Sequence, residues 1–227
     1  MKLISFTICP FLQRVTAVLA AKNAIWESIY IDRGEKPICD KPEWFIAMSP
    51  HGQAPILITE DGRSIFESDP ISEYVDEAIG EPISACDPVK KAQDRAWNAL
   101  ANKVLSSQCA ALRSASKSML ETKLDELGVD LEKIQNRIQG EPYVDGETIG
   151  MIDLAWLPIL HRFDIVERHT AFDILSEFPQ LKRWQRALLA TGIAEKSVAE
   201  NFEQRFSAFY FAPENYLGKV KATRVAA

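Results

Sequence analysis

A cysteine at the start of a predicted helix is the first residue of this chain that could do chemistry. Cys9 follows the apolar run 3–8 and directly precedes Pro10, and proline is favoured at the first helical position because its fixed φ suits the helix. Free backbone N–H groups and the helix dipole favour a thiolate over a thiol at such a position. A lone cysteine is usually a small core residue, but this order of strand, cysteine, proline and helix predicts that Cys9 is a nucleophile.

The spacing after Cys9 argues against one kind of redox chemistry. The residue three positions later is Leu12, so the motif lacks the Cys-x-x-Cys pair with which dithiol oxidoreductases close an internal disulfide. A disulfide of Cys9 therefore needs a partner from outside the motif. A soluble thiol such as glutathione would serve, through a mixed disulfide that a second thiol resolves. Cys39 could also resolve it, although a free loop thiol is the simpler interpretation of that residue.

Composition limits the classes of function. The 227 residues, of which 47% are hydrophobic, can bury a sizeable core and suit one large domain or two small ones. The net charge is -6 and basic residues form no cluster beyond a few scattered ones near the C-terminal end, so nucleic-acid binding has no electrostatic support. We see no targeting segment and no run near the ~20 apolar residues of a membrane span, so we expect a cytoplasmic protein that does not bind membranes.

Cysteine and histidine spacing gives no sign of a metal site. The 4 cysteines and 3 histidines lie far apart, without the short spacings typical of zinc ligands or the density of a disulfide scaffold. We therefore expect reduced thiols and no metal.

The first eighty residues contain the elements that must position Cys9. We expect a strand to Ile8, a helix from Pro10 to about Asn23 and a strand over 27–31, which should pair parallel because the helix is a crossover. An irregular loop with Gly34, Pro37 and Pro42 follows. Strands at 55–59 and 64–66, joined through Asp61-Gly62, should form an antiparallel hairpin. A helix over 68–78, with Ser68 as its N-cap, completes a βαβ-ββα order that is typical of a thioredoxin-like domain.

Helical patterns dominate the rest of the chain. We expect helices at about 88–118, 120–139, 152–167, 171–176, 179–190 and 194–209. Gly80, Pro82 and Pro88 interrupt the periodicity between the two kinds of pattern. The predicted fold class is therefore α/β plus all-α, with a thioredoxin-like domain at 1–80, a linker at 81–87 and an all-helical domain at 88–227.

Four blocks of sequence occur along the chain in a characteristic order and spacing. They are Cys9-Pro10-Phe11-Leu12-Gln13-Arg14, Lys41-Pro42-Glu43-Trp44-Phe45, Gly52-Gln53-Ala54-Pro55 with the later Glu67-Ser68, and Met151-Ile152-Asp153-Leu154-Ala155-Trp156-Leu157-Pro158. Together these blocks resemble the cytosolic glutathione transferases, and within that superfamily the cysteine-type, omega-like class. The resemblance implies a glutathione site on the thioredoxin-like domain, a variable acceptor site facing it from the helical domain, and a homodimer.

Two residues of this pattern have a physical role that can be argued directly. Glutathione carries two carboxylates, an ammonium group and a thiol. At a helix start, the Ser68 N–H and hydroxyl can hold its γ-glutamyl carboxylate while Glu67 pairs with its ammonium group. Plain helix capping is the alternative for both residues.

Other glutathione-binding residues follow from the resemblance alone. It implies a cis bond between Ala54 and Pro55, with the Ala54 backbone hydrogen-bonded to the cysteinyl part of glutathione. It also implies that Lys41 contacts the glycyl carboxylate and that Phe11 and Gln53 line the site. A solvated lysine and a core phenylalanine are the alternatives for Lys41 and Phe11.

The acceptor site is expected on the helical domain, with candidates Val104, Ser107, Arg162 and Trp184. Of these, Arg162 and Trp184 match positions near the acceptor site of omega-like members. Trp184 also fits an apolar core stripe, and Arg162 could instead solvate a helix face or pair with Asp164 or Glu167.

The sequence also departs from the family pattern. A hydroxyl residue usually begins the buried helix of the second domain, whereas this chain has Gly150, leaving Asp153 to accept the Gly150 N–H as one half of a capping box. Pro158 should kink that helix because it lacks an N–H. Gln53 and Ala54 stand where larger apolar residues are common.

These observations lead to one functional hypothesis and two alternatives. We expect a glutathione-dependent thiol transferase or reductase in which Cys9 forms a mixed disulfide with glutathione, acting on a small organic or disulfide acceptor. The first alternative is a transferase that conjugates glutathione to hydrophobic electrophiles. The second is a non-catalytic module that uses the same fold to bind a partner.

Overall fold

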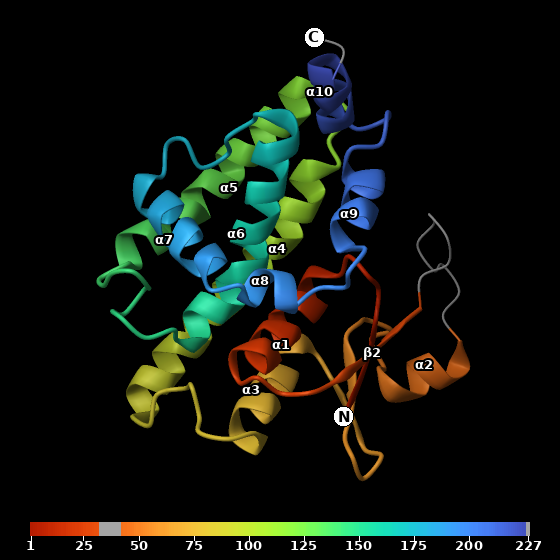
Figure 1. Cartoon of the computed structure of the whole chain (residues 1–227), viewed down its shortest axis with the longest axis vertical. Coiled ribbons are helices and arrows are strands. Elements are labelled where there is room, and N and C mark those ends of the chain that lie inside the picture. Colours follow the sequence, from red (N-terminus) through yellow and green to blue (C-terminus); the bar gives the residue numbers. More distant parts are fainter. Residues whose placement is uncertain (32–41, 226–227) are drawn as a thin grey trace.

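The computed structural model of this protein describes residues 1–31 and 42–225, with side chains up to Thr223. The predictions for Cys39 and Lys41 therefore lie outside the described residues. Figure 1 shows a small sheet with its helices at one end and a larger group of helices above it, with the C-terminal end of the chain farthest from the sheet.

A four-stranded sheet in the order β2-β1-β3-β4 organises the N-terminal part. Strand β1 (Lys2–Ser5) pairs parallel with β2 (Glu27–Tyr30) and antiparallel with β3 (Ile56–Ile58), and β3 pairs antiparallel with β4 (Ser64–Phe66). Helix α1 (Pro10–Ala21) connects the parallel strands and α3 (Ser68–Ala78) follows β4. The predicted thioredoxin-like order is therefore confirmed.

The strand that leads to Cys9 is shorter than expected. It ends at Ser5, and residues 6–9 form a turn in which the Cys9 N–H donates to the Phe6 carbonyl oxygen at 3.1 Å. The turn separates the sheet from the start of α1 and sets the position of the cysteine.

A short helix occupies part of the predicted loop. Helix α2 (Glu43–Met48) has one buried residue, Phe45, which packs with Ile4 and Ile56 of the sheet. A segment this short is difficult to recognise from apolar periodicity. Its stability comes from the tertiary packing of Phe45.

The second part of the described chain is helical, as predicted. Its elements are α4 (Pro88–Leu112), α5 (Lys117–Arg137), α6 (Met151–Thr170), α7 (Pro179–Ala190), α8 (Ile193–Lys196), α9 (Phe202–Tyr210) and α10 (Tyr216–Val225). Helix α6 is buried along most of its length, and helices α1, α4, α7 and α10 pack against it (Figure 1). The core is continuous between the two parts, since Val15 and Leu19 belong to the same cluster as Trp156.

Several expected helix boundaries are wrong. Helix α4 ends at Leu112, and Ser116 starts α5 by accepting the Met119 N–H at 3.3 Å. Helix α6 ends where Ala171 adopts a left-handed φ of 60°, and turns replace the helix expected at 171–176.

The helix expected at 194–209 is in fact two, α8 and α9, separated by a turn at 197–201. Helix α10 was not among the expected elements. The errors at the helix boundaries share a cause, because apolar periodicity alone does not show where a helix is interrupted.

The expected start of α6 is confirmed. Asp153 accepts the Gly150 N–H at 2.7 Å, which is the half of the capping box that needs no hydroxyl at the first position. Helix α6 continues through Pro158, whose carbonyl oxygen accepts a hydrogen bond from Arg162 Nη1 at 3.0 Å.

The described residues offer neither a membrane-spanning helix nor a cluster of metal ligands. None of their helices combines the length and apolar character that crossing a membrane requires. Within residues 1–31 and 42–225, His, Cys, Asp and Glu side chains do not gather in groups of three or more that could hold a metal ion.

Candidate active site

Cys9 occupies the N-cap of α1, as its flanks predict. It has φ -65° and ψ 120°, Pro10 is the first helical residue, and the Gln13 N–H donates to the Cys9 carbonyl oxygen at 3.2 Å. Its Sγ lies 4.0 Å from the carbonyl oxygen of Ala54. The thiol therefore stands between the start of α1 and the turn that leads into β3.

Burial raises the pKa of the Cys9 thiol above its usual value. The Ser5 hydroxyl, the backbone N–H groups of Leu12 and Phe11, and the charge of Arg162 act in the opposite direction and favour the thiolate. The expected donors at the helix N-terminus are therefore present. Desolvation of this half-buried thiol acts against these donors and outweighs them.

The turn beside Cys9 has the expected backbone geometry. The Ala54–Pro55 bond is cis. Ser49 Oγ accepts the Gln53 N–H at 3.2 Å and donates to the Gln53 carbonyl oxygen at 2.9 Å, which fixes the backbone before that bond. Gln53 is exposed, whereas Phe11 is half-buried and packs on the core.

Glu67 and Ser68 begin α3 in a different way from the one expected. Glu67 is the N-cap, with φ 70° and no capping bond from its side chain, and Ser68 is the first helical residue. The predicted N-cap role of Ser68 is therefore wrong. The left-handed Glu67 turns the chain from β4 into α3, so the Ser68 N–H belongs to the first turn, where N–H groups lack intrahelical partners and suit an anion.

An ion pair between a buried arginine and a half-buried aspartate supports this helix start, and neither residue was among the predicted site residues. Arg14 of α1 pairs with Asp69 in the first turn of α3, and Asn102 of α4 bonds to both. Burial lowers the pKa of Arg14, and the charge of Asp69 opposes that effect. The sequence did carry a signal for this pair. It was an arginine on the core-facing side of one helix together with an acidic residue in the first turn of another.

The acceptor-site candidates are not all brought together. Val104 and Trp184 lie in the core, and the Trp184 indole N–H donates to Asp153 at 2.7 Å. Ser107 is half-buried on α4. These contacts identify Trp184 as a core residue, in agreement with the alternative interpretation of its apolar stripe.

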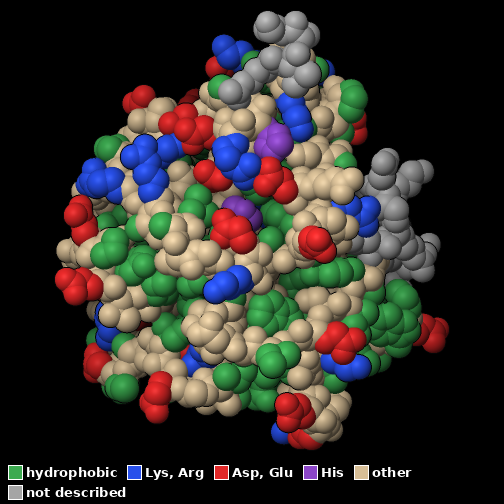
Figure 2. Space-filling model, viewed as in Figure 1, with side chains coloured by type: hydrophobic (Ala, Val, Ile, Leu, Met, Phe, Trp, Pro, Cys, Tyr) green, Lys and Arg blue, Asp and Glu red, His purple; other side chains and the backbone are tan. Residues whose placement is uncertain are grey.

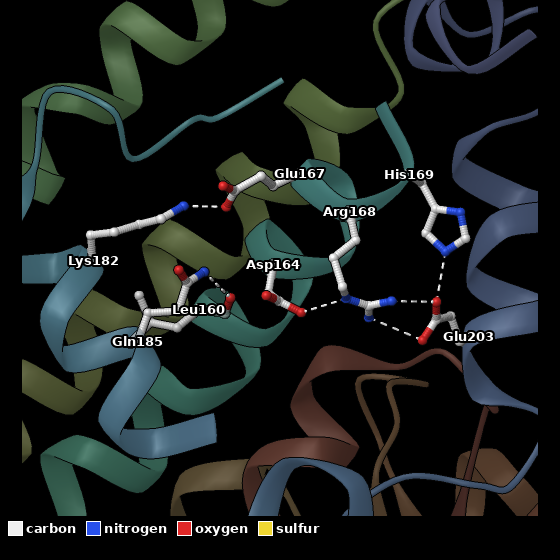
Figure 3. A network of polar contacts seen from close by, with 8 residues as sticks. All are labelled: Leu160, Asp164, Glu167, Arg168, His169, Lys182, Gln185 and Glu203. Carbon is white, nitrogen blue, oxygen red and sulfur yellow. Dashed lines mark hydrogen bonds and ion pairs between the residues drawn. The ribbon is translucent and has the colours of Figure 1, made fainter. Parts of the chain in front are cut away.

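Arg162 is the candidate whose side chain bonds to the backbone next to Cys9. Its side chain is 0% exposed, so it neither solvates a helix face nor pairs with Asp164 or Glu167. Those two carboxylates instead pair with Arg168 and Lys182 in a separate network at the surface (Figure 3). Arg162 Nη2 donates to the Ile8 carbonyl oxygen at 3.2 Å, immediately before Cys9.

A thioredoxin-like sheet with a cysteine at the start of α1, a cis bond facing it and an all-helical second part define a glutathione-transferase architecture. The chain matches the family model "Glutathione S-transferase, N-terminal domain" over residues 3–82 and "Glutathione S-transferase, C-terminal domain" over residues 111–187. The chain belongs to the glutathione S-transferase family, whose cosubstrate is glutathione.

Similar proteins place it near the omega class. It is 30% identical over 188 residues to glutathione S-transferase omega-1 from Sus scrofa, covering 82% of this chain and 75% of that one. It is 32% identical over 191 residues to pyrimidodiazepine synthase from Drosophila melanogaster, covering 81% and 74%. The crystal structure of glutathione transferase Omega 3C from Trametes versicolor has the same fold, with a TM-score of 0.72, 17% identity and coverage of 88% and 89%. The omega-like resemblance is confirmed.

Proposed function

We propose that this glutathione transferase is a thiol transferase or reductase in which Cys9 is the nucleophile. The observation that carries the proposal is the placement of Cys9 at the N-cap of α1, with its Sγ 4.0 Å from the Ala54 carbonyl oxygen beside the cis Ala54–Pro55 bond. A single thiol in this position, without a second cysteine three residues later, suits exchange with glutathione.

The proposed reaction has two steps of sulfur exchange. In the first, the Cys9 thiolate attacks the glutathione sulfur of a glutathionylated acceptor, forming a Cys9–glutathione disulfide and releasing the acceptor as its thiolate or carbanion, which takes up a proton. In the second, a glutathione thiolate attacks that disulfide, forming oxidised glutathione and restoring the Cys9 thiolate. The acceptor leaves with the electron pair of its bond to the glutathione sulfur, and the net reaction consumes one free glutathione for each acceptor released.

The glutathione-binding roles of the other residues are part of the proposal. The free N–H groups at the start of α3 support a role for Ser68 in holding the γ-glutamyl carboxylate, with Glu67 beside the ammonium group. The Ala54 backbone lies next to the thiol, where the cysteinyl part of glutathione must bind. We also propose a small organic or disulfide acceptor, a homodimer and a cytoplasmic location.

One observation favours a second candidate function, the conjugation of glutathione to electrophiles. Because burial raises the pKa of Cys9, a neutral Cys9 thiol could donate a hydrogen bond to a bound glutathione thiolate instead of attacking it. That thiolate would then attack the electrophile. A serine hydroxyl could replace Cys9 in this role.

Intact-mass measurement after incubation with oxidised glutathione tests the proposal. We expect the wild-type protein to gain one glutathione that a reductant removes, and Cys9→Ser to gain none. Cys109→Ser is the matched control, because Cys109 is also free and of intermediate exposure, and this variant should still form the adduct. An adduct that persists in Cys9→Ser would contradict the proposal.

Activity assays separate the candidates further. Cys9→Ser should lose turnover of glutathionyl mixed disulfides while remaining folded by circular dichroism. Retained or increased conjugation by Cys9→Ser, with no mixed-disulfide turnover by the wild type, would support the second candidate. Failure of the wild type to bind immobilised glutathione would instead favour a non-catalytic binding module.

A further inference from the structure

A buried arginine, Arg162, bonds to the backbone immediately before Cys9. The Arg162 guanidinium donates from Nη1 to Gln13 Oε1 and to the Pro158 carbonyl oxygen at 3.0 Å, and from Nη2 to the Ile8 carbonyl oxygen at 3.2 Å. Among residues 1–31 and 42–223, no acidic side chain forms an ion pair with it, and its Nε has no hydrogen-bond partner. Its aromatic neighbour is Phe202, whose ring centre is 5.3 Å from Cζ.

Arg162 belongs to a buried network that links the two parts of the chain. Gln13 of α1 donates from Nε2 towards His161 Nδ1, at 2.8 Å, and to Ser197 Oγ at 3.3 Å. The pKa of His161 is lowered to about 3, chiefly by burial and further by the charge of Arg162, so its ring is neutral near pH 7. The positive charge of this network therefore belongs to Arg162.

Burying an unpaired charge costs free energy, so the presence of a charged Arg162 in the core needs a physical reason. The groups whose negative charge would stabilise Arg162 are Cys109 of α4, Tyr210 of α9 and Cys9, and each is neutral until it loses a proton. Burial raises the pKa of Tyr210, which also hydrogen-bonds with Cys109, so the phenol stays protonated near neutral pH. Among these three, Cys9 combines the charge of Arg162 with backbone N–H donors at a helix start.

We propose that Arg162 is a positioning residue for Cys9. It holds the turn before α1 through the Ile8 carbonyl oxygen, and it supplies from the helical domain the positive charge that stabilises the Cys9 thiolate. This inference rests on the proposed role of Cys9 as nucleophile, and it assigns Arg162 to that thiol rather than to direct contact with the acceptor. It also makes the reactivity of Cys9 depend on the packing of α6 against α1.

The pH dependence of Cys9 alkylation by iodoacetamide tests this proposal, with the modified peptide measured by mass spectrometry. We expect Arg162→Met to shift the profile to higher pH, which makes alkylation at pH 7 severalfold slower. Arg162→Lys keeps the charge and should retain most of the wild-type profile. Arg168→Met, on the same helix but in the surface network, is the matched control and should leave the profile unchanged.

A second pair of variants covers the case in which Arg162→Met does not fold. Gln13→Glu places a carboxylate against the guanidinium and cancels its charge, whereas Gln13→Met removes the same hydrogen bond without adding a charge. We expect a larger shift of the Cys9 profile in Gln13→Glu than in Gln13→Met. Unchanged profiles in a folded Arg162→Met, or equal profiles in the two Gln13 variants, would overturn the proposal.

Failure of this inference can be distinguished from failure of the proposed function. Alkylation reports the ionisation of Cys9 without glutathione or turnover, so the Arg162 effect is measurable even if Cys9→Ser keeps its thiol-transfer activity. Conversely, Cys9→Ser could lose activity while Arg162→Met leaves the alkylation profile unchanged. That result would support Cys9 as the nucleophile and reject Arg162 as its positioning residue.

Discussion

The indole N–H of Trp184 donates a hydrogen bond to Asp153 Oδ1 at 2.7 Å, joining α7 to the start of α6. The same carboxylate accepts the N–H groups of Gly150 at 2.7 Å and Val144 at 3.1 Å. Burial raises the pKa of Asp153, and these three donors oppose that effect. One buried carboxylate thus holds together a helix start, the segment before it and a neighbouring helix.

Trp184→Phe should therefore change stability more than activity. Loss of the indole N–H leaves the buried Asp153 with one donor fewer, and we expect the free energy of unfolding to fall by about 1–3 kcal/mol in urea titrations. Formation of the Cys9–glutathione adduct should persist. Trp44→Phe is the control, because Trp44 is 45% exposed on α2. A loss of acceptor turnover without a loss of stability would restore the acceptor-site role for Trp184.

Gly150→Ser should raise the melting temperature slightly. A Cβ at Gly150 would meet Asp153 Oδ2 at 3.5 Å, an ordinary contact, and the serine hydroxyl could complete the capping box. Since serine exceeds glycine at an N-cap by only a few tenths of a kcal/mol, we expect a rise of about 1 °C by calorimetry. Gly150→Ala adds the Cβ without the hydroxyl and should not raise it. A clear fall for the serine variant would show that the helix start is not stabilised as described.

The surface network around Arg168 should make stability depend on acidic pH. Arg168 donates to both oxygens of Glu203, at 2.8 and 3.0 Å, and His169 Nε2 lies 2.6 Å from Glu203 Oε1 (Figure 3). Figure 2 shows basic and acidic side chains intermixed on this face of the molecule. Mainly through Arg168, the pKa of Glu203 is lowered to about 2 from an ordinary value of 4.5.

A depressed carboxylate pKa means that the stabilisation is fully present above the ordinary pKa and is lost as the pH falls through the folded-state value. We therefore expect Glu203→Gln to lower the urea midpoint at pH 7, and its difference from the wild type to shrink between pH 4.5 and about 2. Glu200→Gln, an exposed position nearby in sequence, is the control and should follow the wild type. A Glu203→Gln difference that is constant across this range would contradict the assignment.

Arg14→Met should weaken both stability and glutathione binding. Arg14 is buried, and its removal leaves Asp69 and Asn102 without their shared donor. We expect the free energy of unfolding to fall by about 2–3 kcal/mol, less than for a fully buried pair because Asp69 is partly exposed. Asp69 follows Ser68 in the first turn of α3, so loss of the ion pair should disturb the proposed site of the γ-glutamyl carboxylate. The Kd for glutathione measured by calorimetry should therefore rise.

Arg95→Met provides the comparison for Arg14→Met. Arg95 pairs with Glu73 at 2.7 Å across α3 and α4, but both side chains are exposed enough for water to screen the pair. We expect its loss to cost less than about 1 kcal/mol and to leave glutathione binding unchanged. Equal effects of the two variants would show that the Arg14–Asp69 pair has no special role at the helix start.

The sequence by itself determined the features that depend on local patterns. Cys9 before Pro10 predicted a thiol at a helix start, and Asp61-Gly62 between apolar runs predicted the β3–β4 hairpin, because turn and cap chemistry act over a few neighbouring residues. The change from alternating strand and helix patterns to helical periodicity alone predicted the two parts of the chain for the same reason.

Only the tertiary structure decided which of these residues are buried and with what partners. Arg162 bonds to Ile8, 154 positions away, and to Gln13, 149 positions away. No local sequence pattern could therefore predict that its charge lies beside the turn that carries Cys9. The raised pKa of Cys9 has the same origin, since desolvation depends on what packs over the thiol and not on its neighbours in sequence. Helix periodicity identifies an apolar face, but the side chains that meet that face come from distant segments, and their packing fixes the electrostatics of the site.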